Sequence, residues 1–173
     1  ADMLVMGETL PIVLDELERG MRFVRKFDYF DVERITEAQR KFVTDLQHGA
    51  KALVSPDFEQ KTEYPFDGQE VSPPTRFWTV LYAGMSACIM GDAESAIRHF
   101  EAGAATLWSV SAHINLSNYY LYYSLALGHQ HAPGTAESKL VLLAQHRRQI
   151  ALWTKLNPST FRHKLLLIDG VIA

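Results

Sequence analysis

A helical spacing of apolar residues runs through almost the whole chain, and it limits the possible folds more than any other feature. In the first segment, apolar residues recur at steps of three or four with charged residues between them: Leu10, Val13, Leu14, Leu17, Met21 and Val24. This spacing places them on one face of an α-helix. No segment of the sequence shows the sustained alternation of a β-strand bounded by hairpin turns. The sequence therefore predicts an all-α fold.

Capping residues and breakers give the expected helix boundaries. Thr9 is expected to cap the first helix, with Pro11 in its first turn. Asp31 is expected to cap the second helix, which should end near Gly49. The buried stripe of that helix is expected to comprise Ile35, Ala38, Phe42 and Leu46.

The later part of the chain repeats this pattern. We expect a helix from the Pro73-Pro74 pair to about residue 90, and others over roughly 93–108 and 111–130. A further helix should start at Thr135 or Ser138, and a last one should follow the break at 157–158. The expected buried face of the penultimate helix comprises Leu140, Leu143, Ile150 and Trp153. The total is about seven helices.

The distribution of proline and glycine divides the chain into three parts. Residues 1–54 are predicted to form an N-terminal helical hairpin, and residues 75–173 to form helical pairs. Residues 55–74 between them are predicted to be a long loop, because no apolar stripe continues through a segment with Pro56, Pro65, Gly68, Pro73 and Pro74. The three parts are expected to make one continuous domain.

Charge and cysteine content exclude several classes of protein. Lys and Arg total 17 against 20 Asp and Glu, so the net charge of −3 argues against a nucleic-acid binder. A lone Cys88 excludes an intrachain disulfide framework, fits a reducing compartment, and is expected to be a small core residue. No apolar run reaches the roughly 18 residues of a membrane span. We expect a soluble cytoplasmic domain without nucleic-acid or membrane partners.

The two ends of the chain suggest a segment of a longer protein. The sequence begins Ala1-Asp2-Met3, and it stops at Ile172-Ala173 inside an expected helix. A domain excised from a larger protein is the preferred interpretation, and a processed small protein is the alternative.

Residues 77–110 have the length and spacing of one tetratricopeptide repeat. Gly84 lies in the middle of the expected first helix, where a partner helix can approach closely, and Gly91-Asp92 supplies the turn. Ala96 and Phe100 reproduce the small-then-aromatic step of the second helix. The sequence therefore predicts tetratricopeptide-like helical hairpins, arranged as a right-handed superhelix or a bundle.

Five stretches, read in order, resemble one family of helical regions. They are Leu-Glu-Arg-Gly-Met-Arg-Phe-Val-Arg-Lys-Phe-Asp-Tyr at 17–29 followed by the helix over 35–46, Ala-Thr-Leu-Trp-Ser-Val-Ser at 105–111, Asn-Tyr-Tyr-Leu-Tyr-Tyr-Ser-Leu-Ala-Leu at 118–127, Gln-His-Arg-Arg-Gln-Ile-Ala-Leu-Trp at 145–153, and Asn-Pro-Ser-Thr-Phe at 157–161. Across 10–173 the chain is similar to the tetratricopeptide-like region of large multi-domain sensor histidine kinases and serine/threonine kinases with a predicted AAA-type ATPase. Asn157 and Thr160 stand where that family has Cys and Asn.

The resemblance implies a non-catalytic scaffold or sensor module in a signalling kinase. Such a module would contact neighbouring domains of the parent protein, or a protein or peptide partner, and transmit a signal through changes in helix tilt. Two alternatives stay open. One is a sensor domain that binds a small molecule or peptide, and the other is a free-standing helical enzyme.

Candidate ligand-binding residues are aromatic and amide side chains of two expected helices: Trp78, Tyr82, Asn118, Tyr119 and Tyr122. Four tyrosines at 119, 120, 122 and 123 are too many for one helix face, so at least one is expected to point away from the core. The tyrosines are interpreted either as a groove for a peptide or small ligand or as core packing with hydroxyls at the rim.

Catalytic and metal-binding motifs are absent from the sequence. It has no phosphate-binding glycine loop, nucleophile elbow or paired-histidine zinc motif, so no catalytic residue, metal or cofactor is predicted. His129 and His131 are interpreted as a solvated turn, and His146-Arg147-Arg148 as a solvated helix face. The enzyme alternative would need His99, His113 or His146 to lie within about 4 Å of an acidic residue in a cleft.

Overall fold

The computed structural model describes residues 2–49, 71–130 and 136–173, and all regular structure in these ranges is helical. Seven of the α-helices have eleven or more residues, which confirms the prediction of an all-α fold. The elements are α1 (Asp2–Val5), α2 (Leu10–Lys26), α3 (Phe30–His48), α5 (Pro73–Ile89), α6 (Ala93–Gly103), the 3₁₀ helix η2 (Ala104–Val110), α7 (Leu116–His129), α8 (Ala136–Leu156) and α9 (Pro158–Ile172).

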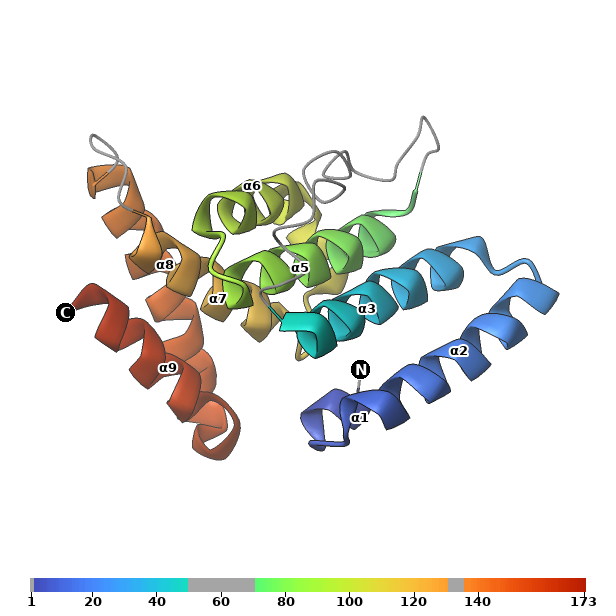
Figure 1. Ribbon diagram of the computed structural model, residues 1–173. Helices are drawn as coiled ribbons and strands as arrows, with labels where there is room; N and C mark the ends of the chain where they lie inside the picture. The colour runs from blue at the N-terminus through green and yellow to red at the C-terminus, as the bar shows by residue number, and fades with distance from the viewer. Residues whose placement is uncertain (1, 50–70, 131–135) are drawn as a thin grey trace.

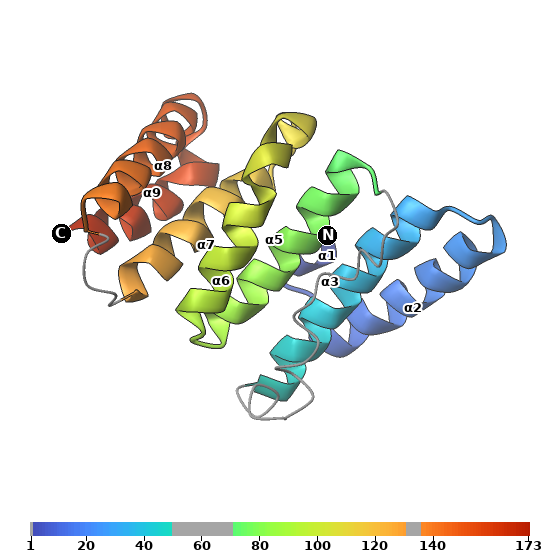
Figure 2. The same ribbon diagram turned by 90° about the horizontal axis from the view of Figure 1, so that it is seen from above.

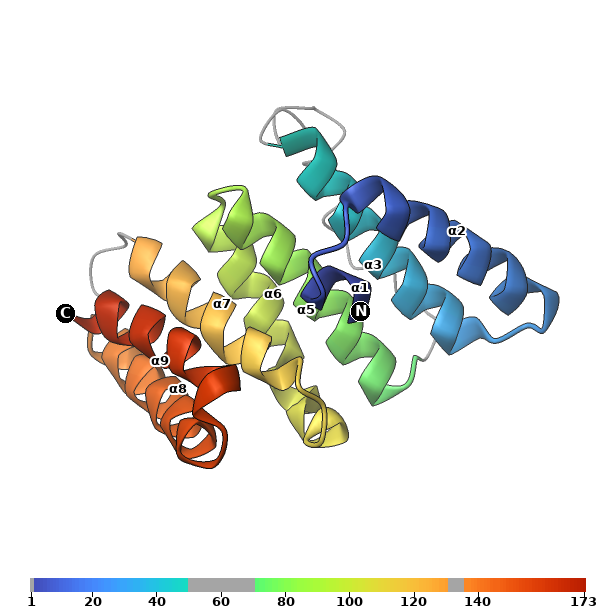
Figure 3. The ribbon, with the colours of Figure 1, turned by 90° about the horizontal axis from the view of Figure 1, so that it is seen from below.

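Helices that follow one another in sequence pack side by side and form an extended row (Figure 1, Figure 2). The row begins with the α2–α3 hairpin, continues through α5 and α6, and ends with the α8–α9 hairpin. Helix α7 is central to the second half, because it packs against α5, α6, α8 and α9. The short α1 lies beneath the row and contacts α2, and its Met3 and Leu4 pack against the main core (Figure 1, Figure 3).

The helix starts agree with the sequence except at α3 and at α7, which is described below. Helix α2 follows Thr9 with a proline in its first turn, although the Thr9 side chain makes no capping hydrogen bond. Helix α3 starts at Phe30 after Tyr29, so the expectation that Asp31 is the cap was wrong. Asp31 lies instead in the first turn, where a carboxylate still favours the positive end of the helix dipole. Gly49 ends α3, as predicted.

Two of the second-half helices, α6 and α7, are shorter than the sequence predicted. The helix expected over 93–108 is α6 to Gly103 and then η2, and α7 starts at Leu116 rather than near 111. The Thr106 hydroxyl donates to the carbonyl of Gly103 at 2.7 Å, and the Ser109 hydroxyl donates to the carbonyl of Thr106 at 2.7 Å. These bonds to carbonyls three residues back accompany the tighter 3₁₀ winding.

Two clusters of buried apolar side chains form the core. The larger one extends from Val13 on α2 to Leu143 on α8 and includes Phe77 and Phe100. The smaller one joins α7, α8 and α9 through Leu121, Ile150 and Ile168. The predicted apolar faces are mostly confirmed, but Leu140 is 55% exposed, so its place on the buried face of α8 was wrong.

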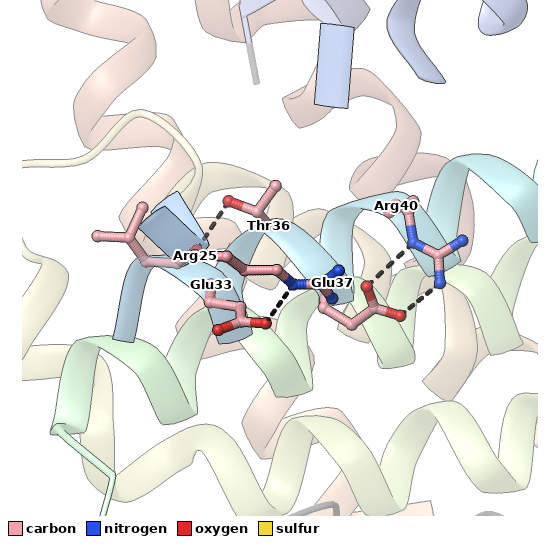
Figure 4. Close-up of polar contacts among 6 residues, drawn as sticks. Arg25, Glu33, Thr36, Glu37 and Arg40 are labelled. Atoms are coloured by element: carbon pink, nitrogen blue, oxygen red, sulfur yellow. Dashed lines mark hydrogen bonds and ion pairs between the residues drawn. The ribbon is translucent and has the colours of Figure 1, made fainter. Parts of the chain in front are cut away.

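Ion pairs lie on the surface of the α2–α3 hairpin (Figure 4). Arg25 on α2 donates from Nε to Glu33 Oε1 on α3 at 2.7 Å. Within α3, Arg40 donates two hydrogen bonds to Glu37, and these bonds lower the pKa of the Glu37 carboxyl. Such exposed pairs contribute roughly 0–1 kcal/mol each, so apolar burial holds the hairpin together.

The long loop expected over 55–74 lies mostly outside the described residues. Pro73 and Pro74 begin α5 as predicted, and the Ser72 hydroxyl caps this helix by accepting a hydrogen bond from the Thr75 amide. None of the helices in the described ranges combines the length and apolar character that crossing a membrane requires.

Candidate functional site

The tyrosines of α7 are all at least half-buried, so the expectation that one of them points away from the core was wrong. Tyr119 and Tyr123 are buried, and Tyr120 and Tyr122 are partly buried. The reason is the central position of α7. Helices α5, α6, α8 and α9 all pack against it, so none of the four tyrosines lies on a fully solvent-exposed side of the helix.

A solvent-open cleft of about 540 Å³ lies beside α7, between the end of α6 with η2 on one side and α8 on the other. Three of the four tyrosines line it. The full lining comprises Glu101, Ala104, Leu107, Tyr119, Tyr120, Tyr123, Leu142, Gln145, His146 and Gln149. The cleft has the size and mixed aromatic and polar lining of small-molecule sites in proteins.

Aromatic rings in the cleft present faces in different directions. Tyr119 meets Tyr120 at an interplanar angle of 85° and Tyr123 at 76°, with ring centroids 5.5 Å and 5.8 Å apart. The His146 imidazole lies 5.2 Å from the Tyr120 ring and 5.1 Å from the Tyr123 ring. The Tyr119 hydroxyl is fixed because it donates to the carbonyl of Phe100 at 2.9 Å. The floor of the cleft is therefore held in place by ring packing and a buried hydrogen bond.

His146 is buried and neutral at physiological pH. Burial lowers the pKa of its imidazole to about 4. The Ser124 hydroxyl donates to the carbonyl of Tyr120 at 2.7 Å and also lies 3.1 Å from His146 Nδ1. Since this hydroxyl has one proton, Nδ1 must be the donor to it, which leaves Nε2 as an acceptor. The ring therefore offers a neutral face and one acceptor nitrogen.

Glu101 gives the rim of the cleft a negative charge. It lies on the last turn of α6, lines the cleft and is exposed to solvent. Burial and then the Glu101 charge raise the pKa of Tyr123 to about 12, while burial, the neighbouring tyrosines and last the same carboxylate raise the pKa of Tyr119. Both phenols therefore remain protonated, and the carboxylate acts on the interior of the cleft.

Of the five residues expected from the sequence, the structure brings only Tyr119 to this cleft. Trp78 and Tyr82 stack on each other on α5, with centroids 5.9 Å apart. Tyr82 also packs on Phe42 of α3, and Trp78 meets His113 edge to face. These two side chains therefore belong to the packing around α5.

Asn118 and Tyr122 also make contacts away from the cleft lining. Asn118 donates to the Asn115 side chain at 3.1 Å and accepts from Lys164 Nζ on α9 at 2.5 Å. Lys164 also donates to Ser117, and burial lowers the pKa of its amine to about 8. The backbone carbonyl of Tyr122 lies 3.6 Å from the thiol of Cys88. Asn118 therefore helps to join α7 to α9.

Sequence reasoning missed His146, Glu101 and the two neighbouring tyrosines as site residues. The expectation of a solvated face holds for Arg147, which is exposed and pairs with Asp169 at 2.5 Å, but it was wrong for His146. A signal was present, because His146 lies three residues after Leu143 and four before Ile150, and both are fully buried. This spacing puts the imidazole on the apolar stripe of α8.

Other residues considered from the sequence are structural or fall outside the described ranges. The Cys88 thiol is partly buried, and burial raises its pKa to about 11, so it is protonated at neutral pH. His129 ends α7, while His131 lies outside the described residues. Within the described ranges, no group of three His, Cys, Asp or Glu side chains could hold a metal ion.

Comparisons of the chain with protein-family models, with curated proteins and with solved structures give no match.

Proposed function

We propose that this chain is a non-catalytic helical binding module that senses a ligand in the cleft between α6, η2, α7 and α8. The observation that carries the proposal is the cleft itself. Tyr119, Tyr123 and His146 are buried side chains that still line an open space of about 540 Å³. A pocket of this size, lined by aromatic and polar side chains, is typical of sites that bind small molecules.

The chemistry of the cleft favours binding over catalysis. His146 pairs with Ser124, and the Ser124 proton is directed to a backbone carbonyl instead of a substrate. Among the described residues, no carboxylate lies at ion-pair distance from His146 to make it a stronger base. A serine and histidine arranged in this way lack the orienting acid and the free hydroxyl of a nucleophilic site.

The position of the cleft suggests how binding could be transmitted. One wall is α6 with η2, the other is α8, and α7 packs against both. A ligand that contacts both walls would favour one relative tilt of these helices over another, as in other helical switches. The resemblance to helical regions of multi-domain kinases supports a role as a cytoplasmic sensor or scaffold that acts on neighbouring domains.

A thermal-shift screen tests the binding function. The variant Ala104→Trp places a large side chain at the exposed rim of the cleft, while Ala102→Trp adds the same group to an exposed position of α6 outside it. We expect some compounds to raise Tm in the wild type and in Ala102→Trp but not in Ala104→Trp. Failure of every compound to show this pattern would contradict the proposal.

A protein-contact role is a second candidate, favoured by exposed apolar side chains on the last hairpin. They are Leu140, Val141, Leu152 and Leu156 on α8 and Leu166 and Leu167 on α9. Several exposed apolar side chains on one helical hairpin are a feature of protein contact sites. Amide hydrogen exchange of α8 and α9 should be slower in the protein encoded by the complete reading frame than in this chain alone. Equal exchange rates would argue against interdomain contact at this hairpin.

A further inference from the structure

The last hairpin, α8 with α9, ends the row of helices and has one side that is exposed to solvent (Figure 1). Both helices pack against α7 and against each other, and buried Ile150 and Ile168 lie on their α7 sides. Helical spacing places eight exposed residues on the sides opposite α7. These residues, which we call the outer face, are Val141, Ala144, Arg148, Leu152 and Lys155 of α8 and Arg162, Leu166 and Gly170 of α9.

The shape of the outer face suits another helix. Val141, Leu152 and Leu166 are 53%, 49% and 59% exposed, so three aliphatic side chains project into solvent. Ala144 and Gly170 are small, and nothing lies within 4 Å of the position that a Cβ atom of Gly170 would take. Small residues let a second helix approach closely, and its ridges can then lie between the aliphatic side chains.

The charge of this hairpin is opposite to that of the chain as a whole. Residues 137–173 have six Lys or Arg and two Asp or Glu, which gives +4, whereas the whole chain has −3. One of the two carboxylates, Asp169, already forms an ion pair within the hairpin. Arg148, Lys155 and Arg162 of the outer face are exposed and form no ion pair with the described residues. A complementary partner therefore carries negative charge.

A lipid surface and a second copy of this chain suit the outer face less well. Aromatic side chains are typical of proteins that lie in membrane interfaces, and the outer face has none. Lipid-binding basic clusters have about four to eight Lys or Arg, whereas the outer face has three. Two copies joined symmetrically through this face would bring the same positive charges together, and these charges would repel each other.

From the exposed aliphatic side chains and the unpaired basic ones, we infer that the outer face binds an acidic amphipathic helix of a partner protein. The apolar stripe of that helix would pack on Leu152 and Leu166, and Asp or Glu beside the stripe would pair with Arg148, Lys155 and Arg162. This inference rests on the proposed protein-contact role of the last hairpin and adds the chemistry of the partner.

Selection from a displayed peptide library tests the partner chemistry. The library contains helices about three heptads long, with Leu at the first and fourth position of each heptad and Glu, Gln or Lys in equal proportion beside them. We expect selection on the immobilised protein to enrich Glu over Lys at least about tenfold at these flanking positions. Attraction to the net charge of the whole chain, −3, would instead enrich Lys, so enrichment of Glu reports the basic hairpin.

Variants then locate the binding surface. Arg148→Glu should lower the affinity of the most enriched peptide about tenfold, and Leu166→Asp should lower it at least as much. The matched controls lie on α2, outside the hairpin. Arg22→Glu makes the same charge change at an exposed residue, and Ile12→Asp replaces an aliphatic side chain that is 50% exposed. Both controls should bind the peptide as the wild type does.

The outcomes separate the partner chemistry from the contact role. Enrichment of Lys or Gln, or equal losses in Arg148→Glu and Arg22→Glu, would overturn the acidic partner. If peptides so enriched still lose affinity in Leu166→Asp and not in Ile12→Asp, the contact role stands. If no peptide is sensitive to Leu166→Asp, the contact role of the outer face fails too. The Tm measurements with Ala104→Trp test the cleft independently.

Two further measurements identify other occupants of the outer face. Cosedimentation with vesicles of phosphatidylcholine and phosphatidylserine that is lost in Leu166→Asp, without enrichment of acidic helices, would overturn the inference in favour of a lipid surface. A dimer in sedimentation velocity that dissociates in Leu166→Asp but not in Ile12→Asp would overturn it in favour of a second copy. We expect neither vesicle binding nor a dimer.

Discussion

The ring of Phe100 on α6 lies directly against the backbone of Gly84 on α5. A Cβ atom added at Gly84 would come within 2.7 Å of both Cε1 and Cζ of that ring. The same ring stacks on Tyr123 at 5.4 Å and meets Tyr119 edge to face at 5.5 Å. The crossing of α5 and α6 therefore places the aromatic ring that supports the floor of the cleft.

Gly84→Ala should destabilise the protein in spite of the higher helix propensity of alanine. Overpacking against Phe100 costs roughly 1–3 kcal/mol, which outweighs a propensity gain of about 1 kcal/mol. Gly20→Ala is the matched control, since Gly20 lies inside α2 with nothing within 4 Å of its Cβ position. Urea unfolding should show a lower midpoint for Gly84→Ala and a higher one for Gly20→Ala. A higher urea midpoint in both variants would contradict the close approach of the Phe100 ring to Gly84.

Buried His146 should make stability depend on pH in the acid range. Its folded pKa of about 4 lies below the ordinary 6.5, so the unfolded state binds the extra proton first as the pH falls. The free energy of unfolding is therefore unaffected by this group above pH 6.5 and falls between pH 6.5 and 4, by on the order of 3 kcal/mol. When unfolding is measured at several pH values, the free energy of unfolding should depend less on pH in His146→Gln than in the wild type. His163→Gln, at an exposed site on α9, should leave the slope unchanged.

The hydroxyl of Tyr119 should contribute to stability through its bond to Phe100. Tyr119→Phe removes a buried donor 2.9 Å from the Phe100 carbonyl, and we expect a loss of about 1 kcal/mol. Tyr29→Phe makes the same chemical change at a side chain that is 57% exposed and should cost less than about 0.5 kcal/mol. Equal effects in chemical denaturation would show that the buried bond is not stabilising.

A buried hydrogen bond between α3 and α5 gives a fourth prediction. The Ser86 hydroxyl donates to the Asp45 carboxylate at 2.6 Å, and Lys41 also pairs with that carboxylate. Ser86→Ala should lower the free energy of unfolding by about 2 kcal/mol, because a buried charged acceptor loses a donor. Ser111→Ala, at an exposed turn, serves as the control. A Ser86→Ala variant as stable as the control would contradict this assignment.

Helix positions followed from the sequence because apolar spacing, proline and glycine act locally. Pro73 starts α5, and Gly91, with φ of 88°, makes the turn before α6. The change to 3₁₀ winding after Gly103 was not predicted, since a bare 3.6-residue period does not distinguish the two helix types. It accompanies hydroxyl-to-carbonyl bonds of Thr106 and Ser109.

The cleft could be predicted only in part, because it depends on which helices surround α7. The tyrosine cluster drew attention to the correct helix, and Tyr119 does line the cleft. The partners Glu101 and His146 come from α6 and α8, and no local pattern places these helices on the same side of α7. Packing of α9 through Lys164 instead takes Asn118 into an interhelical contact.

The histidine resonances of the protein give the most direct test of the cleft as the ligand site. Compounds that raise Tm should be titrated while the ¹³Cε1–¹H signals of His146 and His163 are followed by NMR. Binding in the cleft predicts a saturable one-to-one shift of the His146 signal, with the signal of exposed His163 unchanged. Saturable stabilisation that leaves the His146 signal unmoved would contradict the account, because the ligand would then bind elsewhere.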